Sequence, residues 1–432
     1  MLSSNLSRDA SGVLCFAGQR TDDLAAQYGT PLYLMDEDRI RSNCRMYRKA
    51  LRESFEGQAL PLYASKASCF TQMLRIMAEE GMGLDVVSRG EICTAKRAGF
   101  PMERVCFHGD GKTTEDIRTA LQEHVGCFIV DGIDELLALQ KEADALGVHQ
   151  KVLLRITPGI DPHTYEAVST GKVDVKFGVP IETGQAFEFV RLALAQSALD
   201  VAGLHCHVGS MVFDEMVFED TSDVMLDFIA LLQKELGFIT QVLDLGGGYG
   251  VRYLESDKTM DIAVRIRALS EHIRRKAECV QVPMPYILME PGRSIVADAG
   301  LTVYTVSAVK HIPGFKSYAI TDGGMTDNPR YCLYGAKYTV LPVVASDEEA
   351  TAVFDLAGRC CESGDILQPA VLLPAGLRRG DLVAMCTTGA YHYSMASNYN
   401  RLGRPPVVML REGKSALAVR RETPDDLCAL DI

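Results

Sequence analysis

A lysine, a glycine cluster and a Glu–Arg pair could together perform chemistry on a bound carbonyl compound. Lys66 lies in PLYASKAS at the end of an apolar run, GGGYG covers residues 246–250, and Glu290 and Arg293 lie in EPGRS. Desolvation inside a cavity lowers the pKa of a lysine and leaves a free amine that can attack a carbonyl group. Taken alone, Lys66 is interpreted more simply as a solvated lysine at a strand end.

The glycine cluster and Arg293 are both typical of a phosphate site. Gly247 and Gly248 directly follow the apolar run VLDL, and such a turn can direct backbone N–H groups at an anion. Arg293 can add a charge-assisted hydrogen bond to a phosphate dianion. The glycines alone are explained equally well by a tight turn without a ligand, but the two signals reinforce each other.

Glu290 completes a set that describes the binding of pyridoxal 5'-phosphate. Its alternative is a structural salt bridge to Arg293, but a carboxylate beside a pyridine nitrogen keeps that ring protonated and electron-withdrawing. His205 and His207 alternate in HCH, so their side chains are expected on one side of a strand. We interpret His207 as a residue packed on the cofactor ring, with Ser210 as a phosphate donor, and expect no metal, since no third ligand is evident nearby.

The candidate residues lie at the ends of apolar runs that predict a (β/α)8 barrel. Eight short β-rich runs, separated by amphipathic stretches of helical length, occur between Leu60 and Glu290. Barrel active sites lie at the carboxyl ends of the strands, and phosphate sites are common after strands seven and eight. The runs end at Lys66, Ser88, His108, Asp131, Thr157, His207, Gly248 and Glu290.

The 432 residues exceed the roughly 250 of a typical barrel, so a second domain is expected. After Gly300, strands separated by turn residues are predicted in LTVYTVSAVK, KSYAITD, KYTVLPVV, TAVFDLAG, DLVAMCTT and the pair VVML and SALAVR. Two more strand-like pieces, VLCFAG and TPLYLMD, lie near the N-terminus. We expect an α/β barrel over residues 36–298 and a mainly β domain formed by residues 1–35 and 299–432.

Composition excludes several classes of function. A net charge of −13 argues against binding to nucleic acid or to an anionic membrane, because both need a basic surface. The 13 cysteines show no spacing typical of a zinc site or a disulfide framework. No signal peptide and no apolar run of membrane-spanning length is evident, which indicates a cytoplasmic protein.

The motifs, in their order and spacing, resemble the fold type III pyridoxal-phosphate decarboxylases, and within them the diaminopimelate decarboxylases most closely. The resemblance extends over nearly the whole chain. The matching segments are GTPLYLMDEDRIR at 29–41, YASKAS at 63–68, GLDVVSRGEI at 83–92, FHGDGK at 107–112, STGKVDVKFGVP at 169–180, HCHVGS at 205–210, LGGGYG at 245–250, EPGRSIVADAG at 290–300, DGGMTDNPRYCLYGAKY at 322–338, CESGD at 361–365 and GAYHYSMASNYN at 389–400.

The resemblance implies an enzyme that decarboxylates meso-2,6-diaminopimelate to L-lysine with pyridoxal 5'-phosphate. It implies Lys66 as the lysine that bonds to the cofactor and His207 as the residue stacked on its ring. Asp85 and Glu91 match residues that support this lysine and histidine, and Glu290 matches the partner of the ring nitrogen. The phosphate contacts implied by the resemblance are Ser210, Gly247, Gly248, Arg293 and Tyr391.

In the C-terminal part, the resemblance implies Cys361 as the acid near the reacting carbon, delivered with Glu362 across a homodimer interface. The implied substrate contacts are Arg293, Arg330, Tyr334, Glu362 and Tyr391. Arg330 could hold the distal carboxylate of the substrate through a bidentate bond, while Glu362 pairs with the distal ammonium. Without the resemblance, Arg330 could equally be a turn arginine in a solvated loop, and Cys361 a buried core thiol.

The chain departs from the family pattern at Arg89, Met211 and His392, and YASKAS lacks the asparagine often found after KA. The alternatives are a decarboxylase of the same fold acting on ornithine, arginine, D-lysine or carboxynorspermidine, a racemase, or a non-catalytic cofactor carrier. Arg330 favours a substrate with a distal carboxylate. A racemase of this fold would place arginine, not Glu290, near the ring nitrogen, and a carrier would lack the segment with CESGD.

Overall fold

The computed structural model describes residues 2–161, 173–345 and 351–432. Of the segment STGKVDVKFGVP, only residues 173–180 are therefore described. The chain divides into two compact units. We call the unit formed by Asn43–Gly250 and Met260–Gly292 the barrel unit. The other, formed by Met1–Ser42, Val251–Thr259 and Arg293–Ile432, is called the β unit.

The barrel unit contains a closed barrel of eight parallel strands, which confirms the fold class predicted from the sequence. The strands are β5 (Ala59–Ala64), β6 (Gly83–Val86), β7 (Val105–Phe107), β8 (Cys127–Val130), β9 (Gln150–Thr157), β11 (Leu199–His205), β12 (Val242–Asp244) and β13 (Tyr286–Met289). They pair in chain order, β13 pairs with β5, and the short β10 (Val179–Pro180) adds to β9. Each of the eight predicted runs overlaps one of these strands.

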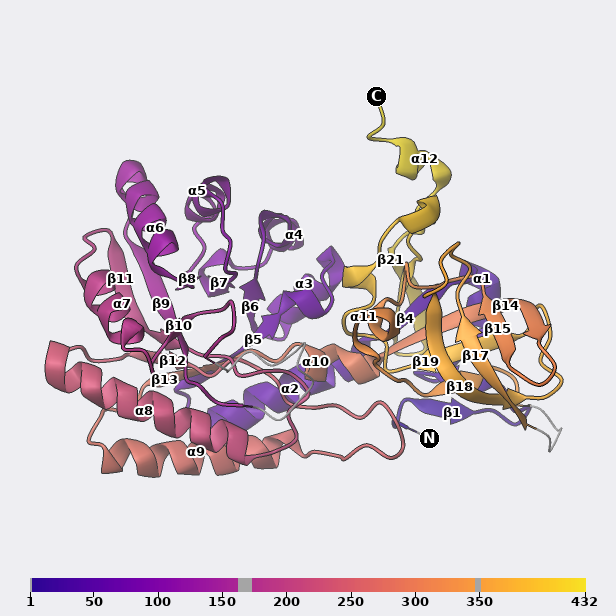
Figure 1. Ribbon diagram of the computed structural model, residues 1–432, viewed down its shortest axis with the longest axis horizontal. Coiled ribbons are helices and arrows are strands. Elements are labelled where there is room, and N and C mark those ends of the chain that lie inside the picture. The colour runs from indigo at the N-terminus through magenta and orange to yellow at the C-terminus, as the bar shows by residue number, and fades with distance from the viewer. Residues whose placement is uncertain (1, 162–172, 346–350) are drawn as a thin grey trace. The chain divides into compact units, whose positions relative to one another are not determined.

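Helices lie along the outside of the barrel strands (Figure 1). They are α3 (Thr71–Glu79), α4 (Arg89–Ala98), α5 (Thr114–Gln122), α6 (Ile133–Leu146), α7 (Gln185–Leu194), α8 (Met216–Leu236) and α9 (Ile262–Cys279), with most of α2 (Glu37–Ser54). Thr113 begins α5 with a capping box, and Gly147 ends α6 in the left-handed conformation, which glycine adopts without steric cost. The capping box fixes the start of α5 after β7, at the mouth of the barrel, and Gly147 ends α6 before β9, at the opposite end.

The barrel interior is filled by apolar side chains. Six of the strands contribute to one buried cluster, formed by Leu62, Cys106, Cys127, Ile129, Leu153, Ala202 and Leu288. A packed interior of this kind is a core and not a pore. Chemistry is therefore left to the residues at the carboxyl ends of the strands.

The β unit is mainly β, as expected. Its larger sheet has the order β18-β17-β15-β14-β4-β20-β21, with β19 paired to β14 and β16. The strands are β4 (Leu32–Asp36), β14 (Gly300–His311), β15 (Ser317–Thr321), β16 (Val340–Pro342), β17 (Thr351–Ala357), β18 (Ile366–Pro374), β19 (Leu382–Cys386), β20 (Val407–Arg411) and β21 (Lys414–Val419). β4 pairs with β14 on one side and β20 on the other.

A smaller sheet of the β unit contains β1 (Leu6–Arg8), β2 (Leu14–Phe16) and β3 (Gln19–Arg20). Its residues Leu14 and Phe16 share a buried core with Leu301 of β14, so the N-terminal residues fold with the C-terminal ones. The helices of this unit are α1 (Thr21–Tyr28), α10 (Arg293–Val296), α11 (Arg330–Tyr334) and α12 (Pro424–Cys428).

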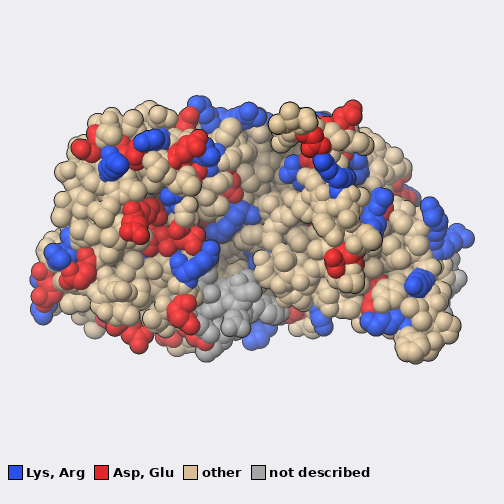
Figure 2. Space-filling view, turned by 45° about the horizontal axis from the view of Figure 1, so that its top comes forward, with Lys and Arg blue, Asp and Glu red and all other residues tan. Residues whose placement is uncertain are grey.

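The charged side chains are mixed in sign. On the face that Figure 2 shows, lysine and arginine side chains are interspersed with acidic ones. No helix within the described ranges has the length and hydropathy that a bilayer crossing demands.

Candidate active site

Lys66 lies at the mouth of the barrel, in a 3-10 turn (Ser65–Ala67) directly after β5. Its Nζ donates a hydrogen bond to Asp85 Oδ2 at 3.2 Å, and Asp85 is buried near the end of β6. The lysine side chain is 43% exposed, so the burial expected from the sequence is only partial. The amine is held in place by a carboxylate while remaining open to a reactant.

From Asp85, a continuous chain of buried polar groups leads to Glu290. Asp85 Oδ1 lies 3.7 Å from His108 Nε2, which lies 3.0 Å from Glu290 Oε1. His205 Nε2 approaches the same oxygen at 3.3 Å. Lys66 and Glu290, which were singled out separately in the sequence, are thus linked through groups at the ends of four strands.

Glu290 is a buried carboxylate that stays ionised. Burial by itself would raise its pKa, but His108 and His205 hold the pKa well below the usual range. Burial lowers the pKa of His205 to about 4, so this ring is neutral at pH 7. Burial beside Glu290 raises the pKa of Asp244 far above its usual value, which leaves one negative charge on the two carboxyl groups.

His108, His205 and Glu290 could in principle hold a metal ion, since one ligand atom of each lies within 4.8 Å of the others. The sequence had offered no third ligand beside His205 and His207, and the fold supplies two. His108 and Glu290, however, both lie beside His205. His207 instead accepts a hydrogen bond from the backbone of Gly247, so it does not belong to this group. A buried, charged carboxylate with two imidazole neighbours accounts for the same arrangement.

His207 is bound to the glycine loop after β12. The N–H of Gly247 donates to His207 Nδ1 at 3.2 Å, which places the proton of the neutral ring on Nε2. Burial and the nearby Lys66 cation lower the pKa of His207 to about 3. The ring is therefore neutral, and its orientation is fixed by the backbone of the loop.

The glycine loop has no room for side chains. A Cβ at Gly247 would lie 2.1 Å from the carbonyl oxygen of Glu290, and one at Gly248 would lie 2.3 Å from that of Gly209. Gly248 also has a φ of +120°, a conformation that favours glycine. Because Gly248 abuts Gly209, the loop carrying Ser210 lies next to the glycine loop, as a phosphate site built from both would need.

Glu91 has a local contact in the structure. It lies in the first turn of α4, where its Oε2 accepts from the backbone N–H of Val87 at 2.7 Å. Burial raises the pKa of Glu91, and the Val87 hydrogen bond opposes this shift. In the structure, Glu91 thus stabilises the turn between β6 and α4, which follows Asp85.

In the β unit, Tyr391 lies between two buried arginines. The guanidinium carbon of Arg293 is 4.7 Å from the centre of the Tyr391 ring, and that of Arg330 is 5.3 Å from it. Arg330 also lies 4.9 Å from the ring of Tyr334. Tyr391 has a φ of +62°, which is an outlier for a bulky residue. Four of the predicted site residues are therefore in one cluster.

Arg330 is not in a solvated loop. It begins the short helix α11 and is buried. Its Nε lacks a hydrogen-bond partner among the described residues. A buried guanidinium with an unsatisfied donor is costly, and an anionic ligand would remove this cost.

Cys361 and Glu362 lie on the loop between β17 and β18, and both are exposed. The backbone N–H of Cys361 donates to Asn400 Oδ1, and Glu362 Oε1 accepts from the N–H of Gly364. These contacts do not include the other predicted site residues. Cys361 is thus not the buried core thiol that its residue type alone suggested.

Pyridoxal 5'-phosphate fits these residues. A buried carboxylate that remains charged needs a positive partner, and Glu290 Oε1 has no well-formed hydrogen bond in the described structure. A pyridinium N–H would be such a partner. The amine of Lys66 is accessible, and the glycine loop offers backbone in place of side chains. Glu290 would thus hold the ring nitrogen, Lys66 the aldehyde carbon and the glycine loop the phosphate.

Four residues of the site were not predicted from the sequence. His108 and Asp244 contact or adjoin Glu290, the hydroxyl of Tyr253 accepts from Arg293 Nη1 at 2.7 Å, and Asp365 anchors the Cys361 loop. Asp365 accepts from the N–H groups of Met325 and Cys360 at 2.6 and 2.7 Å. His108 had a usable signal, because it lies at the end of a predicted strand, whereas Asp244 lies inside the predicted run that ends at Gly248.

Stability is expected to fall as the pH drops below 6.5. Burial lowers the pKa of His205 to about 4 and those of His207 and His392 to about 3, whereas all three titrate near 6.5 when unfolded. Burial also raises the pKa of Asp244, and that of Asp327 to about 7, so these two acids offset part of the effect of the histidines. In this window the unfolded chain binds more protons, so the free energy of unfolding decreases by about 1.4 kcal/mol per pH unit for each histidine. Urea denaturation between about pH 7 and about pH 5 measures the slope. A His205→Gln variant with the wild-type slope would contradict the assignment.

Comparisons with known proteins give one consistent result. A family model described as the pyridoxal binding domain of pyridoxal-dependent decarboxylases matches residues 37–297. The diaminopimelate decarboxylase of Bacillus subtilis is 41% identical over 409 residues, which are 95% of this chain and 93% of that protein. The solved diaminopimelate decarboxylase of M. jannaschii in complex with L-lysine has a TM-score of 0.92 and 33% identity, covering 100% of this chain and 99% of that one. That of Helicobacter pylori with L-lysine has a TM-score of 0.86 and 32% identity, covering 95% and 99%.

Proposed function

Because the chain belongs to the diaminopimelate decarboxylases of the pyridoxal-dependent decarboxylase family, we propose that it converts meso-2,6-diaminopimelate to L-lysine and carbon dioxide. When bound, pyridoxal 5'-phosphate supplies a ring that withdraws the electrons of the breaking carbon–carboxylate bond. The observation that carries the proposal is the buried, ionised Glu290, linked through His108 and Asp85 to the accessible amine of Lys66.

Each barrel residue has a proposed task. Lys66 would hold the cofactor through its amine, with Asp85 accepting a hydrogen bond from its Nζ. Glu290 would keep a proton on the ring nitrogen, and the neutral His207 would pack on the ring. Ser210, Gly247 and Gly248 are proposed to bind the phosphate together with Arg293 and Tyr391. Glu91 supports the turn after Asp85.

The reaction is tested by carbon dioxide release from meso-diaminopimelate, D-lysine and L-ornithine under the same conditions. Turnover of meso-diaminopimelate is expected to exceed that of the other two, because only this substrate has a second carboxylate for Arg330. Faster release from L-ornithine or D-lysine would favour the alternative of another basic amino-acid decarboxylase. No release from any of them would refute the proposal.

Arg330 is proposed to bind the distal carboxylate, with Tyr334 beside it and Glu362 for the distal ammonium. In an Arg330→Lys variant the charge remains but the bidentate fork is lost. We expect kcat/KM for meso-diaminopimelate to fall about 10- to 100-fold, the value of one strong charge-assisted hydrogen bond. For D-lysine, which has no distal carboxylate, kcat/KM should change little. The exposed Arg379→Lys is the control, and equal losses for both substrates would exclude this role.

We further propose a cytoplasmic homodimer in which Cys361 and Glu362 complete the active site across the interface, with Cys361 as the acid near the reacting carbon. Both side chains are exposed, and Asp365 fixes their loop. Residues that reach into the active site of a second subunit would need both properties. The free state of the thirteen cysteines is in keeping with a reducing compartment. We also propose that residues 36–298 act as the cofactor-binding domain, and residues 1–35 and 299–432 as the domain for substrate and dimer contacts.

Shared sites can be detected by mixing two inactive variants. Lys66→Ala and the double variant Cys361→Ala/Glu362→Ala each lack one half of a site. After random exchange of subunits, about half of the dimers are mixed, and each of these has one intact site out of two. Recovery of about a quarter of the wild-type activity is expected. Mixtures that stay inactive although native mass spectrometry detects mixed dimers would contradict the sharing.

A further inference from the structure

A pocket of the barrel unit is lined by charged side chains of one sign only. It has a volume of about 400 Å³ and lies between α2 and the first residues of β5 and β13. Since these strands begin here, the pocket is at the amino ends of the barrel strands, whereas Lys66 and Glu290 are at the carboxyl ends. Its lining residues are Arg45, Arg48, Lys49, Arg52, Gly57, Ala59, Leu60, Pro61 and Tyr286. We call it the basic pocket.

The four basic residues occupy one face of α2. Their spacing of three, four and seven residues brings their side chains together on a helix. Like charges at these spacings destabilise a helix, and the whole chain has a net charge of −13. The helix dipole compensates only Arg52 in the last turn. Helix stability therefore gives no reason for Arg45 and Arg48 to be basic, since of the first three only Lys49 has an acidic residue, Glu53, four positions later on α2.

The protein itself neutralises only part of this charge. Arg45 forms two hydrogen bonds of 2.8 Å to the carboxylate of Glu80, and Arg48 donates to the backbone oxygen of Glu80 at 2.9 Å. Within the described part of the chain, neither Lys49 nor Arg52 has a side-chain hydrogen bond or ion pair. Glu80 thus orients two arginines and leaves an excess of positive charge at the pocket.

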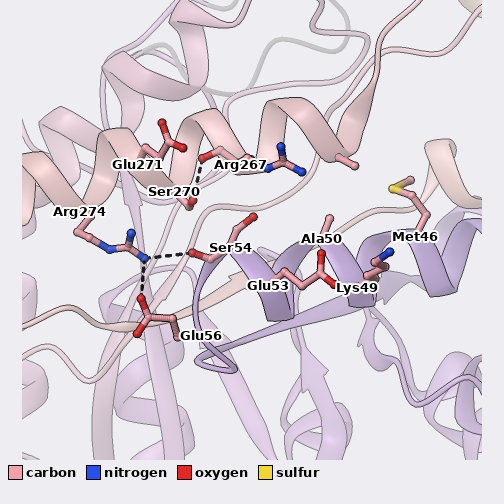
Figure 3. A pocket seen from close by; sticks show the side chains of 11 residues that line it. Met46, Lys49, Ala50, Glu53, Ser54, Glu56, Arg267, Ser270, Glu271 and Arg274 are labelled. Carbon is pink, nitrogen blue, oxygen red and sulfur yellow. Dashed lines mark hydrogen bonds and ion pairs between the residues drawn. The ribbon is translucent and has the colours of Figure 1, made fainter.

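A groove on the other side of Lys49 gives a comparison within the same unit (Figure 3). It lies between α2 and α9, has a volume of about 500 Å³, and is lined by Lys49, Arg267 and Arg274 together with Glu53, Glu56 and Glu271. Arg274 contacts Glu56 at 3.3 Å and the backbone oxygen of Ser54 at 3.2 Å. The groove balances its own charge, and the basic pocket does not.

We propose that the basic pocket binds a small phosphate-bearing polyanion, at a site separate from that of the cofactor. Arginine guanidinium groups match phosphate oxygens in a bidentate fashion, and a volume of about 400 Å³ is in the range of small-molecule sites. Glu80 holds Arg45 and Arg48 in place before a ligand arrives, which reduces the entropic cost of binding. Lys49 and Arg52 have no ion-pair partner among the described residues, so their positive charges are available to the anion. This proposal does not depend on the reaction that the barrel catalyses.

The test is calorimetric titration of the holoenzyme with pyrophosphate at low ionic strength. The cofactor occupies its own phosphate site in the holoenzyme, and the part of the binding that is lost in the Lys49→Ala/Arg52→Ala variant separates the basic pocket from anion binding at Arg330. The variant Lys49→Ala/Arg52→Ala is expected to raise the Kd for pyrophosphate about 10-fold or more, the equivalent of roughly 1.4 kcal/mol. It should keep its turnover, which shows that it is folded. Arg267→Ala, which removes an exposed arginine from the mixed groove, should leave the Kd unchanged within about 2-fold.

Three outcomes would overturn the proposal. The first is the absence of binding heat with the wild-type holoenzyme. The second is an equal Kd for the wild type and the Lys49→Ala/Arg52→Ala variant. The third is tighter binding of citrate than of pyrophosphate, because this would assign the pocket to carboxylates. Weaker binding of citrate and a Kd for pyrophosphate that rises with added salt are the expected results.

Discussion

The Lys66→Ala variant is expected to release carbon dioxide from meso-diaminopimelate at least about 10⁴-fold more slowly than the wild type. One positioned proton-transfer group contributes up to about 10⁴-fold, and Lys66 in addition supplies the only bond proposed between chain and cofactor. The visible absorbance of the lysine-bound cofactor should disappear as well. Steady-state carbon dioxide release and the absorption spectrum of the purified protein measure the two effects.

The control for Lys66 is Lys141→Ala, which removes an exposed lysine of α6 and should keep both colour and activity. Circular dichroism establishes that both variants are folded. An active Lys66→Ala protein that is still yellow would refute the assignment of this lysine. A colourless wild-type protein after incubation with the cofactor would refute the cofactor itself.

The Glu290→Gln variant is expected to keep the bound cofactor and to lose about 10²- to 10³-fold in kcat, the usual cost of removing one preorganised electrostatic group. Glutamine has the shape of glutamate but no negative charge, so it cannot stabilise a protonated ring nitrogen. His205 cannot substitute for it, because burial lowers its pKa to about 4 and keeps it neutral. Retained colour with lost turnover would distinguish this variant from Lys66→Ala.

Carbon dioxide release at saturating cofactor and the absorption spectrum measure the Glu290→Gln effect. The matched control is Glu278→Gln on the exposed side of α9, which should behave as the wild type. If Glu290→Gln retains most of its kcat, the carboxylate has a structural task only. The alternative of a metal held by His108, His205 and Glu290 would instead make activity sensitive to a chelator.

The barrel could be predicted from the sequence because its signals are local. A buried parallel strand is a short apolar run, and residues such as Lys66 and Glu290 follow at its end. The contacts of Glu290 could not be predicted in this way. His108 is far from it in the sequence, and only closure of the barrel brings the ends of β7, β11 and β13 together. A histidine at a strand end is visible in a sequence, but its partner is not.

The β unit was predicted less completely. Strand β18 was missed because ILQPAVLLP contains Pro369 and ends at Pro374, and proline cannot donate a ladder hydrogen bond. The structure resolves the conflict by placing β18 at the end of the sheet order, where an edge tolerates proline. The burial of Arg330 could not be predicted from the sequence either. Pro329 before it indicates a turn, but the sequence does not show which residues cover that turn.

The position of β4 inside the larger sheet has a consequence for synthesis on the ribosome. Its residues Leu32–Asp36 are fully buried between β14 and β20, yet β14 emerges about 260 residues later. At the usual elongation rate of about 5–20 residues per second, β4 waits roughly 13 to 52 s for its first partner strand. Both edges of β4 therefore lack their partner strands throughout the translation of the barrel, and an unpaired strand edge can hydrogen-bond to another chain.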